Sequence, residues 1–175
     1  MKKSILEKLK RIKLLIMDVD GVMTDGKIIM DDAGHEIKNF NVRDGHGIKL
    51  LQRYGIPVAI LTGRQSKVVA HRASDLEIKD VHQKVFNKKE VFEEILKQHK
   101  LSPDEAAFIG DDIVDIPVLK RVGFSVAVAD ADDMVKKSVD YIAKNKGGHG
   151  AVREVCEMIL QAQGKWVEIA TRYEF

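Results

Sequence analysis

Short, unbroken apolar runs alternate along the chain with longer segments in which apolar residues recur every three or four positions. An apolar run without polar alternation is typical of a strand that is buried on both faces, as in a parallel sheet. The strong runs are Leu14–Met17, Val58–Leu61, Ala106–Ile109 and Ser125–Ala129, and the weaker ones are Ile78–Val81 and Tyr141–Ala143. We expect these runs to be the strands of one sheet.

The segments between the runs have the periodicity of amphipathic helices. After Asn87, for example, Val91, Phe92, Ile95 and Leu96 form one apolar stripe between Lys and Glu residues. The expected helices cover residues 45–54, 65–73, 88–99, 113–121, 132–137 and 151–163, after a short N-terminal helix over 5–12. Strands that alternate with helices predict an α/β fold, with a doubly wound parallel sheet and right-handed crossovers.

The segment over about 27–42 breaks this alternation. Lys27–Met30 and His35–Val42 are predicted to be two strands around an Asp/Gly turn, which gives a β-hairpin directly after the first strand. The chain shows no internal repeat and no domain boundary. Residues 1–175 are therefore expected to form one domain, with a C-terminal tail over about 164–175.

The composition narrows the possible functions. The 29 Lys and Arg residues nearly balance the 27 Asp and Glu residues, and a net charge of +2 is too small for a dedicated nucleic-acid-binding protein. Unbroken apolar stretches such as Leu14–Met17 are only four residues long, so no membrane partner is expected. The single cysteine, Cys156, fits a reducing compartment, and we expect a cytoplasmic protein.

Polar residues cluster after the apolar runs and before the helix at 88–99. They are Asp18, Asp20, Thr62, Gly63, Arg64, Lys88, Asp111, Asp112 and Asp115. In open α/β sheets, ligands bind at the carboxyl ends of the strands, where these residues are expected to meet. Carboxylates gathered there repel one another, and their pKa values rise unless a cation neutralises them. The donors are oxygens without a Cys/His cluster, which favours Mg²⁺ over Zn²⁺ or copper.

A hard cation beside a lysine, a threonine and an arginine makes a phosphate site, and the two first aspartates supply the chemistry. Asp18 is the predicted nucleophile. Asp20 is the predicted general acid for the leaving alcohol, and then the base that activates water against the phospho-aspartate. Thr62 and Lys88 are the predicted phosphate ligands.

Several of these positions keep an alternative. Lys89 competes with Lys88, although it would project about 100° farther round the helix. Asp112 can be an N-cap as readily as a residue near the metal. Asp115 either orients Lys88 or a metal-bound water, or it faces solvent.

At these residues the chain resembles the haloacid dehalogenase superfamily of phosphotransferases, whose four motifs match in order at Asp18–Val22, Thr62, Lys88 and Gly110–Asp115. Within that superfamily the chain is similar to the phosphatases of 3-deoxy-D-manno-octulosonate (Kdo) 8-phosphate. The similar blocks are Asp18–Gly26, Asn41–Gly45, Leu61–Arg64, Gly110–Asp112 and Gly147–Glu154.

The resemblance implies a ligand set and substrate contacts. Mg²⁺ would be held by the Asp18 side chain, the backbone carbonyl of Asp20, and Asp111. Substrate contacts would come from Asn41, Val42, Arg43, Asp44, Gly45, Gly63, Arg64, Arg72 and Lys88. A plain surface charge is the alternative for Arg43, as is helix-dipole complementation for Arg72. His149 and Lys84 depart from the family pattern, which has Arg and Gly at these places.

The resemblance also implies how the site is closed. Residues 21–61 and 65–87 are too short to hold a cap domain. The family members are homotetramers in which neighbouring subunits close the site with hairpins and tails. The apolar hairpin residues Ile28, Ile29, Met30 and Phe40 fit such burial, and the tail with Trp166 and Tyr173 is a second candidate contact.

The function implied by the resemblance is Mg²⁺-dependent hydrolysis of Kdo 8-phosphate, a small-molecule sugar phosphate, in the synthesis of lipopolysaccharide precursors. The motifs fit the 9-phosphates of KDN or sialate equally well, because these substrates also offer a carboxylate and a terminal phosphate. A phospho-accepting receiver domain of a signalling protein is the non-enzymatic alternative. In receivers, however, the phosphorylated aspartate follows a later strand than the first.

Overall fold

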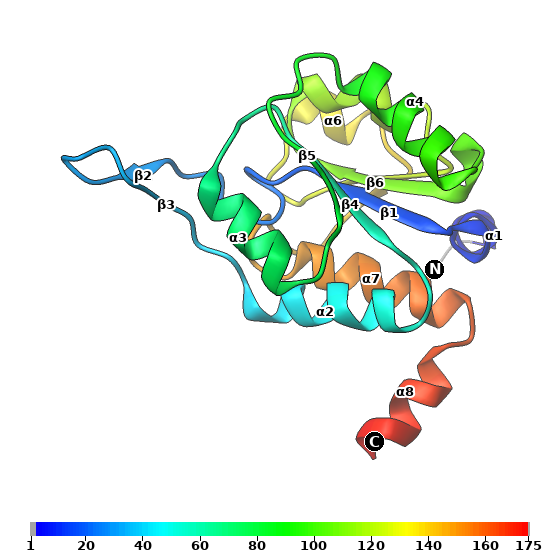
Figure 1. The fold of residues 1–175 in the computed structure, drawn as a ribbon. Coiled ribbons are helices and arrows are strands. Elements are labelled where there is room, and N and C mark those ends of the chain that lie inside the picture. The colour runs from blue at the N-terminus through cyan, green and yellow to red at the C-terminus, as the bar shows by residue number, and fades with distance from the viewer. Residues whose placement is uncertain (1–2, 175) are drawn as a thin grey trace.

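A six-stranded parallel sheet lies at the centre of the computed structural model, which describes residues 3–174 (Figure 1). The strand order is β5-β4-β1-β6-β7-β8, and every neighbouring pair is parallel. The strands are β1 (Leu14–Met17), β4 (Val58–Leu61), β5 (Asp80–His82), β6 (Ala106–Gly110), β7 (Phe124–Ala127) and β8 (Tyr141–Ile142). All six expected runs contribute to strands, and the predicted doubly wound sheet is confirmed.

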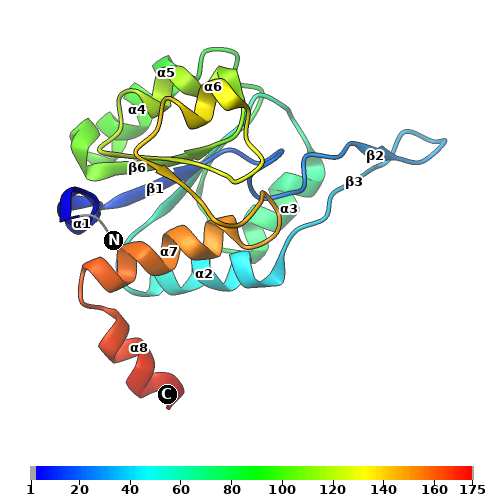
Figure 2. The ribbon, with the colours of Figure 1, turned by 180° about the vertical axis from the view of Figure 1, so that it is seen from behind.

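Helices cover both faces of the sheet (Figures 1 and 2). One face carries α2 (Val42–Arg53), α3 (Lys67–Asp75) and α7 (Ala151–Ala162), and the other carries α4 (Lys88–His99), α5 (Ile116–Leu119) and α6 (Asp133–Lys136). The strand order reverses between β1 and β6, which are neighbours in the sheet. Ligands bind at such a reversal in open α/β sheets, so the ends of β1 and β6 are the place to look for a site.

The apolar runs form the hydrophobic core, as their unbroken apolar pattern predicts. Every residue of β1, β4 and β6 is buried, because helices cover both faces of these strands. In α7 the apolar stripe is buried, whereas Arg153 and Glu157 pair along its outer side at 2.5 Å. Burial raises the pKa of the Cys156 thiol, which marks this cysteine as an inert core residue.

The predicted hairpin is present but its strands are shorter than expected. β2 (Ile29–Met30) and β3 (Glu36–Ile37) pair antiparallel and project from the body (Figure 2). The expectation of a strand up to Val42 is wrong, as is a helix start at residue 45. The Asn41 side chain accepts hydrogen bonds from the amides of Arg43 (2.8 Å) and Asp44 (3.4 Å), and this N-cap starts α2 at Val42.

Two other elements differ from expectation. The helix expected over 113–121 is a 3₁₀ turn, Ile113–Asp115, followed by the short α5, whose first turn contains Pro117. Proline lacks an N–H and favours the first turn of a helix, so a new helix starts there. The C-terminal segment forms α8 (Trp166–Tyr173), and α1 (Lys3–Arg11) precedes β1.

The segments between the sequence motifs were expected to be too short to hold a cap domain. Between β1 and α4 the chain holds only the hairpin, α2, β4, α3 and β5, so the predicted absence of a cap domain is confirmed for this part. Over residues 3–174 no helix has the length and apolar character needed to cross a membrane.

Candidate active site

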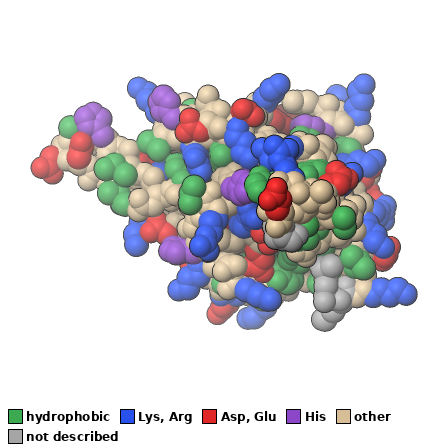
Figure 3. All heavy atoms as spheres, turned by 90° about the horizontal axis from the view of Figure 1, so that it is seen from below, with side chains coloured by type: hydrophobic (Ala, Val, Ile, Leu, Met, Phe, Trp, Pro, Cys, Tyr) green, Lys and Arg blue, Asp and Glu red, His purple; other side chains and the backbone are tan. Residues whose placement is uncertain are grey.

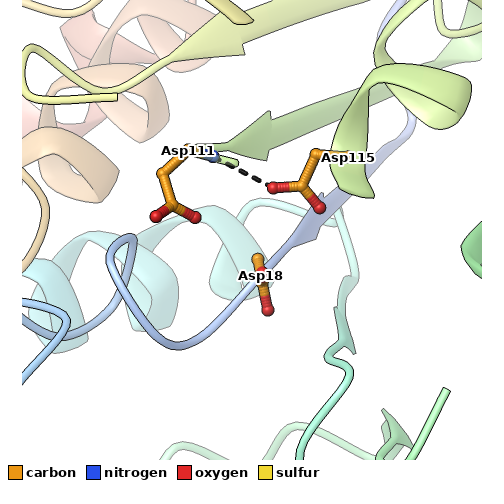
Figure 4. A group of neighbouring side chains, drawn as sticks. All are labelled: Asp18, Asp111 and Asp115. Carbon is orange, nitrogen blue, oxygen red and sulfur yellow. Dashed lines mark hydrogen bonds between the residues drawn. The ribbon is translucent and has the colours of Figure 1, made fainter. Parts of the chain in front are cut away.

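Three carboxylates meet at the ends of β1 and β6. Asp18 directly follows β1, Asp111 directly follows β6, and Asp115 ends the 3₁₀ turn before α5. One carboxylate oxygen of each lies within 4.8 Å of the others. Figure 4 shows the three neighbouring side chains on these separate elements, with the Asp115 carboxylate hydrogen-bonded to the Asp111 amide. The parallel sheet therefore brings together residues that lie almost a hundred positions apart in the sequence.

Lys88 joins two of these carboxylates. It is buried at the start of α4, and its Nζ donates to Asp18 Oδ2 (2.7 Å) and Asp115 Oδ1 (2.6 Å). Burial alone would lower the pKa of Lys88, but the two carboxylates outweigh it and raise the pKa overall. Lys89 instead lies 3.8 Å from Glu93 on the helix surface. The structure thus places Lys88, and not Lys89, in the cluster.

Asp111 is the least compensated member of the cluster. Its Oδ1 is buried without a hydrogen-bond partner among the described residues. Burial, followed by the charges of Asp18 and Asp115, raises the pKa of its carboxyl group to about 8. Gly21 has a φ of +84°, and a Cβ atom there would lie 2.0 Å from Asp111 Oδ2, so this close approach requires glycine.

The donor set fits a hard divalent cation. All of its side-chain donors are carboxylate oxygens, and one of them is buried and free to accept a ligand. A cation there would neutralise the mutual repulsion that raises the Asp111 pKa. Asp18 and Asp111 would be the ligands, together with the Asp20 backbone carbonyl that the family resemblance implies.

The structure decides between the alternatives that the sequence left open for Asp115 and Asp112. Asp115 is fully buried, and its Oδ2 accepts from the amides of Asp111 (3.0 Å) and Asp112 (3.3 Å) while its Oδ1 accepts from Lys88. It therefore orients Lys88 and does not face solvent. Asp112 is exposed and caps the 3₁₀ turn by accepting from the Ile113 amide at 2.7 Å.

A cavity of about 320 Å³ opens next to the cluster. Its lining includes Asp18, Asp20, Thr62, Gly63, Arg64, Lys88, Asp111 and Asp112, together with Gly26, Ile28 and Val114. Thr62 is buried, and its amide donates to the carbonyl of His82 at 2.9 Å, which fixes the turn after β4. The cavity thus unites the nucleophile, acid and phosphate ligands that the sequence proposes.

The segment 41–45 does not join this cavity. Asn41 caps α2, and its Nδ2 donates to the Gly148 carbonyl at 3.1 Å. Asp44 is buried and accepts from the amides of Gly150 (3.3 Å) and Arg153 (2.7 Å) at the start of α7. Both Asp44 oxygens therefore bind this helix terminus, and the expected contact between Asp44 and the substrate stays a prediction.

The remaining candidate substrate residues also lie outside the cavity. Arg72 stacks over the Phe40 ring, with its guanidinium 5.6 Å from the ring centre, and a Cβ atom at Gly45 would lie 2.4 Å from it. Val42 is 80% exposed. Arg43 lines a second cavity with His149 and Arg153, among others. Within one chain, none of these residues reaches the carboxylate cluster.

The two departures from the family pattern have clear local contacts. His149 Nδ1 lies 2.7 Å from the Gly147 carbonyl oxygen. Lys84 adopts a left-handed φ of 58°, and its amide donates to the Arg64 carbonyl at 3.2 Å, so it shapes the loop beside the cavity. The tail residue Tyr173 contacts its own chain, with its hydroxyl 3.1 Å from His46 Nε2.

Sequence reasoning missed Lys38 and Glu36. Lys38 donates to Asp20 Oδ1, and Glu36 accepts from Arg64 at 2.7 Å. The available signal was the order Glu-Ile-Lys on the returning hairpin strand, which alternates charged and apolar residues. The structure reverses the usual arrangement of such a strand, because Ile37 is 54% exposed and the lysine is buried.

Known proteins with similar sequences carry the same architecture. The sequence pattern of haloacid dehalogenase-like hydrolases matches residues 73–155. The Escherichia coli (strain K12) 3-deoxy-D-manno-octulosonate 8-phosphate phosphatase is 47% identical over 161 residues, which cover 92% of this chain and 86% of that protein.

Solved structures agree with this relationship. The phosphatase of the same name from Moraxella catarrhalis, in complex with a magnesium ion, a phosphate ion and Kdo, superposes with a TM-score of 0.96 at 38% identity and covers 99% of both chains. The cobalt-bound phosphatase from Haemophilus influenzae gives a TM-score of 0.88 at 47% identity, covering 90% of this chain and 92% of that one. The receiver alternative is therefore wrong. The chain is a phosphatase that belongs to the haloacid dehalogenase-like hydrolases and, among them, to the 3-deoxy-D-manno-octulosonate 8-phosphate phosphatase family.

Proposed function

We propose that the chain hydrolyses Kdo 8-phosphate to Kdo and inorganic phosphate, with Mg²⁺ and through a phospho-aspartate on Asp18. The observation that carries the proposal is the convergence of Asp18, Asp111, Asp115 and Lys88 beside a cavity that also contains Asp20 and Thr62. The names of the Escherichia coli and Moraxella catarrhalis relatives support the choice of substrate.

Asp18 is held ready for attack on phosphorus. Its Oδ1 accepts from the Val19 amide at 2.6 Å, and its Oδ2 accepts from Lys88 at 2.7 Å. In the first step an Asp18 oxygen forms a bond to phosphorus while the bond to the sugar oxygen breaks, and Asp20 gives that oxygen a proton. In the second step Asp20 takes a proton from water, whose oxygen forms a bond to phosphorus while the bond between phosphorus and Asp18 breaks, and inorganic phosphate is released.

Lys88 and Thr62 bind the phosphoryl oxygens, and they must supply much of the acceleration. Hydrolysis of phosphate monoesters requires up to ~10²¹-fold acceleration, of which one acid–base group gives about 10²- to 10⁴-fold. Fixed positive charge and hydrogen-bond donors account for most of the rest. A bound divalent cation supplies further positive charge against the carboxylates and the phosphate.

Arg64 is the candidate within the cavity for the substrate carboxylate. Arg43 and Arg72 could reach a substrate only in the cavity of another copy, because they lie away from the cavity of their own chain. We propose a homotetramer in which neighbouring copies cover the open sites. The exposed hairpin residues Ile28 (58%) and Met30 (61%) support it, and Figure 3 shows hydrophobic side chains gathered on the projecting hairpin.

The proposal places the reaction in the cytoplasm, in the synthesis of lipopolysaccharide precursors. Its test is phosphate release from a panel of sugar phosphates with and without Mg²⁺. We expect Mg²⁺-dependent release and a kcat/KM for Kdo 8-phosphate at least about tenfold above that for KDN or sialate 9-phosphate, a difference of about 1.4 kcal/mol. A preference for Kdo 8-phosphate of less than about tenfold over either 9-phosphate would overturn the choice of substrate. Release that is unaffected by a chelator would overturn the Mg²⁺ requirement.

A further inference from the structure

Lys38 is a buried lysine on the hairpin. It directly follows β3, and its side chain is 1% exposed, whereas its neighbour Ile37 is 54% exposed. Strands at a protein surface normally face apolar side chains inward and charged ones outward. Removing an ammonium group from water is unfavourable unless charged partners compensate for it. This inversion indicates that the position requires the charge of the lysine.

The partners of Lys38 form a chain of charges that leads into the cavity. Its Nζ donates to Asp20 Oδ1 and lies 3.1 Å from Glu36 Oε1. Glu36 also accepts from Arg64 Nη2 (2.7 Å) and Ser66 Oγ (2.5 Å). Glu36 is thereby fixed to the loop after β4, and it fixes the lysine in turn. The hairpin is tied to the body of the protein through these contacts.

Asp20 depends on this network for its position. Over residues 3–174 no backbone amide donates to its carboxylate, which is held by Lys38 and by Arg64, whose Nε lies 3.7 Å away. Asp18, in contrast, is fixed by its own chain segment through the Val19 amide. Loss of the lysine would therefore leave Asp20 with only the longer contact to Arg64, and it would leave the nucleophile in place.

We propose that Lys38 is a positioning residue for phosphoryl transfer, which holds the Asp20 carboxyl group on the leaving-group side of Asp18. The inference rests on the proposed function, in which Asp20 protonates the sugar oxygen as its bond to phosphorus breaks. Proton transfer requires the carboxyl group within hydrogen-bond reach of that oxygen, so a carboxyl group that swings away cannot donate. The hairpin then serves its own active site, besides any contact with a neighbouring copy.

The leaving group separates this role from a structural one. An alkyl phosphate such as Kdo 8-phosphate needs a proton on its leaving oxygen, whereas p-nitrophenyl phosphate releases a stable anion without one. The value of kcat/KM reports the steps up to release of the leaving group. We therefore measure kcat/KM of Lys38→Met for both substrates on one preparation, in which partial unfolding lowers both values by the same factor.

We expect Lys38→Met to reduce kcat/KM for Kdo 8-phosphate at least about tenfold more than for p-nitrophenyl phosphate, because general acid catalysis contributes about 10²- to 10⁴-fold. Lys38→Arg, which retains the charge, should recover much of this difference. Lys27→Met is the matched control, since Lys27 lies on the same hairpin and pairs with Asp25 in solvent, with 73% of its side chain exposed. It should leave the ratio of the two substrates unchanged.

Equal losses on both substrates, or no loss, would overturn the inference. If Lys38→Met does not fold, Lys38→Gln, which keeps a hydrogen-bond donor, is measured in the same way and judged by the same ratio. Asp20→Asn provides the benchmark, and it should show at least as large a selective loss. If Asp20→Asn has no selective loss, the proposed role of Asp20 is wrong, and this outcome is distinct from a failure of Lys38→Met alone.

Discussion

Replacing Asp111 by asparagine should stabilise the metal-free protein, even though it removes a candidate metal ligand. Burial and the charges of Asp18 and Asp115 raise the pKa of Asp111 from 3.8 to about 8. Between these pH values the folded chain binds a proton that the unfolded chain has released, so stability falls as the pH rises. At about 1.4 kcal/mol per pH unit, the loss is on the order of 5 kcal/mol and is complete above about pH 8.

The Asp111→Asn chain has no such loss, because an amide does not ionise. We expect its free energy of unfolding, relative to that of the unmodified chain, to increase by about 4 kcal/mol between about pH 5 and about pH 8. Urea denaturation followed by circular dichroism, in the presence of a chelator, measures this difference. Asp112→Asn is the matched control, since Asp112 is exposed and asparagine is an equally good N-cap.

Mg²⁺ should narrow this difference in stability. A ligand that binds only the folded state adds about 2.7 kcal/mol at a concentration of about 100 Kd, and only the unmodified chain has the complete donor set. The reasoning is refuted if the difference in unfolding free energy between Asp111→Asn and the unmodified chain is constant across this pH range. It is also refuted if Mg²⁺ stabilises both chains to the same extent.

Three other substitutions test the site and its supports. Lys88→Met should lower kcat at least about 100-fold, because removal of one hydrogen-bond donor to a transition-state oxyanion costs about 10²- to 10³-fold, and phosphate release assays measure the loss. Gly21→Ala should weaken Mg²⁺ binding, because its Cβ atom would lie 2.0 Å from Asp111 Oδ2. An undiminished rise of Tm with Mg²⁺ would contradict this. Asp44→Ala should reduce the free energy of unfolding by about 1 to 2 kcal/mol, since two amides at the start of α7 lose their acceptor. Unchanged urea denaturation would show that these two bonds contribute little.

The sheet and the carboxylate cluster could be predicted because they depend on strong, repeated signals. An apolar run such as Leu14–Met17 can be buried on both faces only in the middle of a covered sheet, and the alternation with helices fixes the strands as parallel. Parallel strands end at one edge, so Asp18 and Asp111 had to approach each other once both runs were recognised as strands. The cluster therefore follows from topology without knowledge of any side-chain contact.

The details that could not be predicted depend on contacts between distant segments. Asn41 starts α2 through its own cap, a local signal that was overlooked. The burial of Asp44 depends on the start of α7, more than a hundred residues away, and no local pattern reveals it. The inward position of Lys38 likewise follows from Asp20 and Glu36, and it contradicts the rule that charged residues face solvent.

These exceptions to local rules lie where the active site is. Asp111 has a buried oxygen without a partner, and Lys38 is buried beside an exposed Ile37. Natural sequences agree with local rules except at functional positions, so such conflicts indicate function independently of any relative. In this fold without a cap domain, the hairpin has two roles. Its outward apolar side chains offer a surface that a neighbouring copy can bury, and its inward charges hold Asp20. A substitution on the outward side of this hairpin can therefore alter the rate of the reaction, because the inward charged side chains that hold Asp20 lie on the same hairpin.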